Sequence, residues 1–239
     1  MNSQVLRALE HLVDAVLYIE SESNDELRSL LSTKNRFGST GEMGFFSMRE
    51  QGMVSIDNPS EYFMTSRADD DLVSGSALTV VKEGTRPIIV EIESLVTKTF
   101  TPFPSRISES LKREQLSTLI SILEQRGRVS LYDKDIVVKT TGGLKFKEQA
   151  VNLSVIISIV SSVYDKGISN DTVFIADVGL TGELKKVPSL DLRIRELDRR
   201  GFKRVYIAKN ALSRTLKVSN IKIIELKSLQ EVINHVFSK

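Results

Sequence analysis

The sequence predicts a mixed α/β fold, and three observations support this prediction. Short β-branched runs alternate with segments in which apolar residues recur every three or four positions, so strands and helices alternate along the chain. Glycines and prolines separate these segments. With 239 residues, of which 41% are hydrophobic and 27% charged, the chain can bury the core of one large domain or of two small ones.

The first part of the chain is rich in short apolar runs. Strands are predicted at 15–19, 44–48 and 53–56, where β-branched and aromatic residues stand between polar clusters or glycines. Segment 26–33 fits both a helical stripe and a strand, although its position before a turn favours the strand. Asn58 as a cap, Pro59 at the first helical position and Glu61 two residues later predict a short helix.

A charged stretch without periodicity, residues 67–71, predicts a domain boundary after Arg67. Beyond it, strands are predicted at 77–81, 88–96, 129–132, 136–138, 172–178, 205–208 and 221–226, with a loop over 97–110. Helices are predicted from about Leu116 to Gly127, over 150–163, from Pro188 to Leu197, and from Leu229 to Val236. Ser228 and Glu231 predict a capping box before the last helix.

Composition excludes several kinds of site. There is no cysteine and there are only two histidines, so neither a disulfide framework nor a Cys/His zinc site can form, and no metal site is expected. No apolar run approaches the ~20 residues that cross a bilayer, and the start MNSQVLRALEHL has no secretory leader pattern, so we expect a cytoplasmic protein without membrane contact. The net charge is only +2, so any DNA binding must depend on a local basic surface.

Five segments of the chain match, in the same order, the motifs of one bacterial family: KNRFGSTGEMGFFSMREQGM, NPSEYF, GTRPIIVEI, TGGLKFKEQAVNL and ADVGLTGEL. The sequence thus resembles the RadA (Sms) family of RecA-like motors, which carry a Lon-protease-like C-terminal domain and drive branch migration in DNA repair. The resemblance implies that residues 1–67 are the last part of the RecA-like core. It also implies that residues 68–239 form a non-proteolytic Lon-like domain of the ribosomal S5 domain 2-like fold. A strand at 26–33 follows from the same resemblance.

Two features of that family are missing between Met1 and Lys239. There is no G-x-x-x-x-G-K-[ST] phosphate loop, whose backbone amides and lysine hold nucleotide phosphates, and no four-cysteine zinc module. We therefore expect this chain alone neither to bind nor to hydrolyse ATP, which together with Mg²⁺ belongs to the complete motor. A truncation and a natural short form both explain the missing parts.

The segment Lys34-Asn35-Arg36-Phe37-Gly38 is the strongest candidate site. Alternate residues of an extended segment point to one side, so Lys34 and Arg36 can face the same ligand. The resemblance implies that these cations contact the ATP of a neighbouring protomer; contact with DNA phosphates and a merely solvated basic turn are the alternatives. Asn35 and Gly38 support the turn, and Phe37 is expected to anchor it in the core.

The Lon-like resemblance also identifies what is absent. Ala150 stands where Lon-type peptidases have their serine nucleophile, and Asp191 stands at or next to the position of their lysine base. Ser154 with Lys185 or Lys186 could form an unrelated dyad, but a core serine and surface lysines are the preferred interpretation. A divergent Lon-like serine peptidase therefore remains the alternative function, and a small-molecule-binding module has no supporting motif.

A second basic segment is a candidate for DNA contact. Arg106, Lys112 and Arg113 match a basic segment of the family and could neutralise phosphates, although Ser105 stands where the family often has another arginine. A solvated loop is the alternative. A further cluster is interpreted as a solvated helix face: Arg193, Arg195, Arg199, Arg200, Lys203 and Arg204.

These observations together predict the DNA-binding and assembly portion of a RadA-like recombination and repair motor. The resemblance implies a ring-shaped homo-oligomer, a hexamer, with single-stranded or branched DNA and a RecA-type recombinase as its partners.

Overall fold

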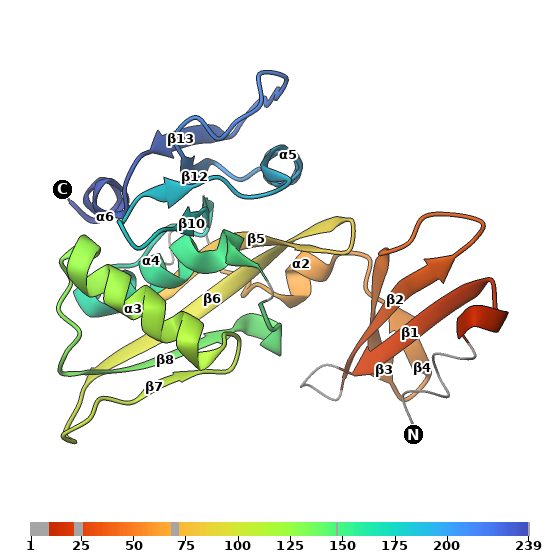
Figure 1. Cartoon of the computed structure of the whole chain (residues 1–239), viewed down its shortest axis with the longest axis horizontal. Helices are drawn as coiled ribbons and strands as arrows, with labels where there is room; N and C mark the ends of the chain where they lie inside the picture. The colour runs from red at the N-terminus through yellow and green to blue at the C-terminus, as the bar shows by residue number, and fades with distance from the viewer. Residues whose placement is uncertain (1–9, 22–25, 68–71, 147, 239) are drawn as a thin grey trace. The chain divides into compact units, whose positions relative to one another are not determined.

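The computed structural model describes residues 10–21, 26–67, 72–146 and 148–238, and it confirms the mixed α/β class (Figure 1). The chain divides into two compact units. The first unit comprises residues 1–59 and 82–88, and the second comprises residues 60–81 and 89–239. The predicted boundary after Arg67 adjoins residues 68–71, which lie outside the described residues.

The first unit contains a four-stranded antiparallel sheet in the order β1-β2-β3-β4. Its strands are β1 (Ala15–Ser21), β2 (Leu27–Asn35), β3 (Met43–Arg49) and β4 (Gly52–Ser55), so all four strands predicted for this region are confirmed. Leu27 and Phe45 are almost completely buried and form the core side of the sheet. The helical alternative for 26–33 is excluded, because this segment pairs with both of its neighbours.

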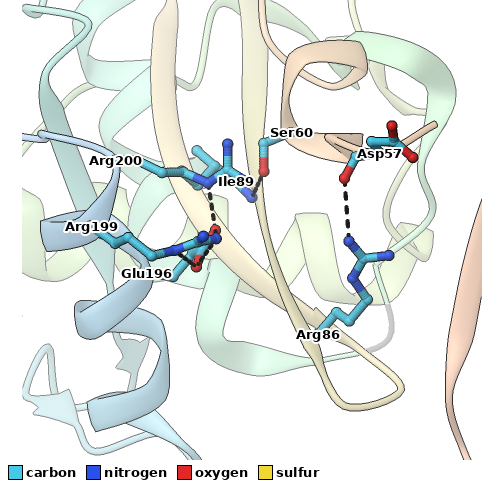
Figure 2. Close-up of polar contacts among 7 residues, drawn as sticks. All are labelled: Asp57, Ser60, Arg86, Ile89, Glu196, Arg199 and Arg200. Atoms are coloured by element: carbon cyan, nitrogen blue, oxygen red, sulfur yellow. Dashed lines mark hydrogen bonds and ion pairs between the residues drawn. The ribbon is translucent and has the colours of Figure 1, made fainter.

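The tip of the hairpin between β5 and β6, residues 82–88, also belongs to the first unit. Gly84 has a φ of 59°, and a Cβ atom there would lie 2.0 Å from the carbonyl oxygen of Gly41. Only glycine therefore fits this close approach. Beside it, Arg86 donates from Nη2 to the carbonyl oxygen of Asp57 at 3.4 Å (Figure 2).

The second unit is built on a seven-stranded mixed sheet in the order β13-β12-β9-β5-β6-β8-β7. Its strands are β5 (Ser76–Glu83), β6 (Arg86–Lys98), β7 (Arg106–Ser108), β8 (Lys134–Thr140), β9 (Thr172–Ile175), β12 (Arg204–Ala208) and β13 (Lys222–Leu226). β5, β9, β12 and β13 run parallel, β6 and β8 pair antiparallel, and β7 lies parallel to β8 at the edge. A small second sheet pairs β10 (Asp177–Val178) with β11 (Leu184–Lys185).

Three strand predictions in this unit are wrong in detail. Residues 129–132 form no strand: Val129 and Leu131 alternate with exposed residues, but the Glu124 carboxylate accepts the Leu131 N–H at 3.0 Å in place of a neighbouring strand. Strand β7 lies inside the predicted loop 97–110, and its three residues are too few to leave a periodic signal. The predicted strand 172–178 is interrupted at Ala176, after which the chain joins the small sheet.

The helices are α2 (Pro59–Tyr62), α3 (Arg113–Gly127), α4 (Asn152–Tyr164), α5 (Leu190–Arg199) and α6 (Leu229–Phe237), with single 3₁₀ turns at Thr141–Gly143 and Gln149–Val151. All five helix predictions are confirmed. Figure 1 shows α3 and α4 lying over one face of the large sheet, and α6 packs against both. The Ser228 Oγ accepts the Glu231 N–H at 3.3 Å, whereas the Glu231 carboxylate accepts the N–H of Lys227 and not that of Ser228.

A stripe of serines joins α4 to β6. Ser158 and Ser94 share a hydrogen bond of 2.6 Å, and the Ser162 Oγ accepts the Val96 N–H at 3.0 Å. The Ser94–Ser158 pair is buried, where unpaired hydroxyl groups would be costly, and the Ser162 contact is partly buried, so the two contacts help to specify how the helix sits on the sheet. Among the described residues, no helix has the length and apolar character needed to span a bilayer.

Candidate nucleotide-contact and DNA-contact residues

The basic turn follows directly from the end of β2, which pairs with β1. Lys34 lies opposite Val16 in the ladder, and its Nζ donates to the carbonyl oxygen of Glu10 at 2.5 Å. Two residues later, the Arg36 Nη1 donates to the Asp14 Oδ1 at 2.8 Å. Both cationic side chains therefore reach the same short segment, residues 10–14, as expected for alternate positions of an extended chain.

Asp14 binds Arg36 twice. Besides the carboxylate contact, its carbonyl oxygen accepts the Arg36 N–H at 2.9 Å. The two side chains are 63% and 51% exposed, and ion pairs this exposed contribute at most about 1 kcal/mol. Within the described part of the chain, the Arg36 Nε and Nη2 have no hydrogen-bond partner. The guanidinium is thus oriented while most of its donors stay available for an anion.

Asn35 and Gly38 shape the turn. The Asn35 Oδ1 accepts the N–H of Phe37 at 3.0 Å, and its Nδ2 donates to the Ser39 carbonyl oxygen at 3.5 Å. This side-chain-to-backbone turn brings Asn35 so close to Gly38 that an added Cβ atom would lie 3.0 Å from Nδ2. The two residues therefore hold the backbone that places Arg36.

The prediction that Phe37 anchors the turn in the core is wrong, because its side chain is 85% exposed. The core side of the sheet is filled by Leu27 and Phe45, and the turn leaves the sheet beyond the end of β2. A single phenylalanine inside a short basic motif offers no sequence signal that separates these two placements.

Ala150 is the residue that the sequence predicts at the position of the peptidase serine. Ala150 lies in a 3₁₀ turn and is 1% exposed. The Asp191 carboxylate accepts two hydrogen bonds from Ser213. One comes from the hydroxyl group and the other from the backbone N–H, at 3.4 Å. Ser154 is fully buried and donates to the Val151 carbonyl oxygen at 2.8 Å, and Lys185 is exposed. The interpretation of a core serine and a surface lysine is therefore confirmed.

In the basic cluster at 193–204, one arginine is buried although the whole cluster was predicted to lie on a solvated helix face. Arg193 was interpreted as part of a solvated helix face, but it is 1% exposed and pairs with both carboxylate oxygens of Glu148, at 2.8 and 2.5 Å. It also donates to the carbonyl oxygens of Val80 and Pro188. Because it stands one turn after Leu190, it falls on the buried face of α5.

Other arginines of this cluster are neutralised locally. Arg199 and Arg200 both bind the carboxylate of Glu196, the first with a contact of 2.8 Å (Figure 2). Burial by itself raises the pKa of Glu196, but the hydrogen bonds from Arg200 and Arg199 outweigh it and lower the pKa below its ordinary value. Arg204 pairs with Asp171 at 3.2 Å. This part of the cluster thus has little free positive charge for DNA.

The predicted DNA-contact residues lie on two neighbouring elements. Arg106 begins β7 at the edge of the sheet, while Lys112 caps the N-terminus of α3 and Arg113 is its first residue. None of these three side chains has an ion-pair partner among the residues described. Cations at a helix N-terminus oppose the helix dipole, so Lys112 and Arg113 do not stabilise α3 there. The charges of Arg106, Lys112 and Arg113 are therefore available to bind phosphates.

A pocket of about 640 Å³ lies beside Ala150, between α3, the start of α4 and β10. Along its wall, Gln115 donates to Asn152 at 2.9 Å and Asn152 donates to Asp177 at 2.7 Å. No sequence motif predicts this chain of hydrogen bonds, because its members come from three separate segments of the sequence. In the described residues, no group of three or more histidine, aspartate or glutamate side chains is placed to hold a metal ion.

The fold and these sites define a two-unit α/β protein with an oriented cationic turn in one unit and a buried alanine at position 150 in the other. No family model matches the chain. Curated relatives do match. The chain is 39% identical over 232 residues to the DNA repair protein RadA of Streptococcus pneumoniae (strain ATCC BAA-255 / R6), and the match covers 97% of this chain and 55% of that protein.

Two further relatives give the same result. The chain is 40% identical to the DNA repair protein RadA of Streptococcus pyogenes serotype M1, over 97% of this chain and 51% of that protein. It is also 40% identical to the DNA repair protein RadA of Bacillus subtilis (strain 168), over 95% of this chain and 49% of that protein. The chain therefore belongs to the RadA family, and it spans about half the length of the curated relatives it matches.

Proposed function

We propose that this chain is the DNA-binding and assembly portion of a RadA-like motor that drives branch migration in recombination and DNA repair. Its relatives are named DNA repair protein RadA, which supports the repair role. The motor would act in the cytoplasm as a ring of identical subunits, a hexamer, on single-stranded or branched DNA and together with a RecA-type recombinase.

The observation that carries this proposal is the orientation of Lys34 and Arg36. Both reach segment 10–14, and most of the Arg36 donors have no partner in the described structure. A planar guanidinium suits the oxygens of a transferring phosphoryl group, where an arginine from a neighbouring subunit can accelerate hydrolysis by about 10³- to 10⁵-fold. In the complete motor, the two cations would therefore contact the nucleotide of the next subunit, and loss of ATP turnover on removing Arg36 tests this role.

ATP and Mg²⁺ enter this function only through the complete motor. The chain itself has no phosphate-binding loop, so the nucleotide would be held by the subunit that contributes that loop. Lys34 and Arg36 would then add charge stabilisation from the other side of the interface. Asp14 keeps Arg36 extended until a phosphate competes for it.

The second unit would serve as a scaffold without proteolysis. We expect unfolded casein to stay intact when incubated with the chain, because Ala150 has no group that can be acylated. A serine-reactive fluorophosphonate probe should also leave the protein unlabelled. Casein fragments together with a labelled serine would contradict the scaffold role and support a divergent peptidase.

DNA binding by the second unit is expected to depend on charge and to be indifferent to base sequence. Replacing Arg106, Lys112 and Arg113 together by alanine should weaken binding to single strands. The slope of log affinity against log salt should also fall by about 2, since each phosphate contact on a single strand contributes about 0.7. The measurement is a fluorescence-anisotropy titration of a labelled oligonucleotide at several salt concentrations.

A matched control removes the same charge elsewhere in the unit. Arg195, Lys203 and Lys222 are exposed cations on other elements, and their joint replacement by alanine should leave the salt slope unchanged. If this control variant lowers the salt slope and the Arg106, Lys112 and Arg113 variant does not, the DNA contact lies at the control residues instead.

A further inference from the structure

Two phenylalanines in the connection between β6 and β7 are almost fully exposed: Phe100 at 95% and Phe103 at 86%. We call this connection, residues 99–105, the aromatic loop; Figure 1 shows it protruding beyond the lower left end of the sheet. Tyr132, in the turn before β8, is 74% exposed. Single exposed apolar residues are common, but a cluster of exposed aromatic residues indicates a binding surface.

The aromatic loop is held in place by backbone and side-chain contacts. The Thr99 N–H donates to the Asp133 carbonyl oxygen at 2.9 Å, and the Ser105 N–H donates to the Asp135 carboxylate at 2.6 Å. These contacts tie one end of the loop to the turn that carries Tyr132 and the other end to the start of β8, so the three aromatic residues belong to one end of the unit. Pro102 and Pro104 further restrict the loop backbone. A loop fixed in advance loses little entropy when it binds a ligand.

Three cations surround this loop. Lys98 and Arg106 flank it directly in the sequence, and Lys134 lies opposite Lys98 in the β6–β8 ladder. Two carboxylates lie nearby, but Asp135 accepts the Ser105 N–H and Asp133 lies 3.6 Å from the Lys134 Nζ. The loop itself carries no charge. Three cations against these two carboxylates leave a local net charge of +1 beside the exposed aromatic side chains.

We propose that the aromatic loop binds single-stranded nucleic acid, with Phe100, Phe103 and Tyr132 stacking on unpaired bases while Lys98, Arg106 and Lys134 contact the phosphates. Aromatic platforms among cations bind single strands because every base has a face to stack on, whereas bases in a duplex are already stacked. Like charges around the loop disfavour contact between the loops of two copies. This inference rests on the DNA-binding part of the proposed function and adds the aromatic residues that would recognise unpaired bases.

The chain contains no tryptophan, so a single introduced tryptophan reports on stacking. Phe103→Trp should keep the affinity for a 20-nucleotide thymidine oligomer, and its fluorescence should be quenched as the oligomer binds. An abasic strand of equal length should bind through its phosphates without quenching. A duplex of the same length should quench much less than the single strand.

The reciprocal experiment removes the stacking side chains. The double variant Phe100→Ala with Phe103→Ala should lose about tenfold or more in single-strand affinity, since stacking on one base is worth about 1–3 kcal/mol. Its salt slope should stay unchanged, because no charge is removed. Far-UV circular dichroism and the thermal midpoint should also stay unchanged for side chains this exposed. The matched control is Leu180→Ala, which removes a 73% exposed apolar side chain from another loop.

Three outcomes would overturn the proposal. Unchanged single-strand affinity of the double variant, while the salt slope still depends on Lys112 and Arg113, would reject stacking by the loop and leave DNA binding standing. A drop in assembly mass by light scattering with unchanged DNA affinity would make the loop an interface between copies. If the unaltered chain binds no single strand at low salt, the DNA-binding part of the proposed function fails as well.

Discussion

Replacing Arg36 by alanine in the complete motor is expected to lower ATP turnover by about 10³-fold or more, the scale on which arginines that reach a neighbour's nucleotide act. Folding and ATP binding should persist. The Asp14–Arg36 pair is mostly exposed, so its loss costs at most about 1 kcal/mol of stability. The measurement is steady-state ATP hydrolysis with DNA present, alongside nucleotide binding by the same protein.

Mixing two inactive motors tests whether Arg36 acts across an interface. Subunits carrying Arg36→Ala are combined with subunits that keep Arg36 but have a disabled phosphate loop, so complete sites exist only at mixed interfaces. Hydrolysis should recover in the mixture, although each parent is inactive. No such recovery is possible if Arg36 serves the nucleotide of its own subunit.

Arg49→Ala is the matched control, because Arg49 is an exposed arginine at the end of β3 in the same unit. Its turnover should equal that of the unaltered motor. Normal turnover by the Arg36→Ala motor would reject the nucleotide-contact role. Lost DNA binding with intact ATP hydrolysis would instead assign the basic turn to DNA.

Replacing Glu91 by alanine is expected to destabilise the second unit by about 3–5 kcal/mol, as when one partner of a buried ion pair is removed. Glu91 lies in β6 and is fully buried. Its carboxylate binds the Arg67 Nη1 at 2.6 Å, the Ser76 hydroxyl at 2.6 Å and the Thr65 N–H at 2.7 Å. Without it, the Arg67 guanidinium, only 11% exposed, loses its counter-charge.

The measurement is urea unfolding followed by circular dichroism. Glu93→Ala is the control from the same strand, since Glu93 pairs with Lys139 at 3.2 Å on the accessible face of the sheet and should cost less than about 1 kcal/mol. Equal losses for the two variants would show that the buried network contributes no more than an accessible pair.

The same carboxylate makes stability depend on pH. Burial raises the pKa of Glu91, but the hydrogen bonds from Ser76, Thr65 and Arg67 outweigh burial and hold the pKa below its ordinary value of 4.5. Its stabilising contribution is therefore complete above that ordinary pKa and is lost as the pH falls through the lower pKa of the folded state. Glu91→Gln should lose less stability than the unaltered chain between neutral pH and pH about 3.

The sequence alone predicted most features whose causes are local. The four strands of the first unit follow from β-branched runs between turns, and the Ser228 cap of α6 follows from residues within one helical turn. The position of Lys34 and Arg36 on one side of an extended segment has the same origin. The lack of a hydroxyl at Ala150 and the family relationship follow from residue identities alone.

Exposure, in contrast, was decided by residues far apart in the chain. Phe37 is outside because Leu27 and Phe45 already fill the core, and Arg193 is inside because Glu148 and Val80 come from other elements to pair with its charge. The burial of a single phenylalanine or arginine cannot be predicted from hydrophobic periodicity, because one residue does not make a periodic pattern.

The same reason explains β7 and the aromatic loop. Strand β7 exists because its three residues meet β8, and the loop before it is held by Asp133 in the neighbouring turn and by Asp135 at the start of β8. Local backbone preference and residue spacing can be predicted from the sequence. Contacts between residues that lie 30 positions apart, such as Ser105 and Asp135, depend instead on the order of strands in the sheet. Only the tertiary structure therefore showed which aromatic residues and which cations are free to meet a ligand.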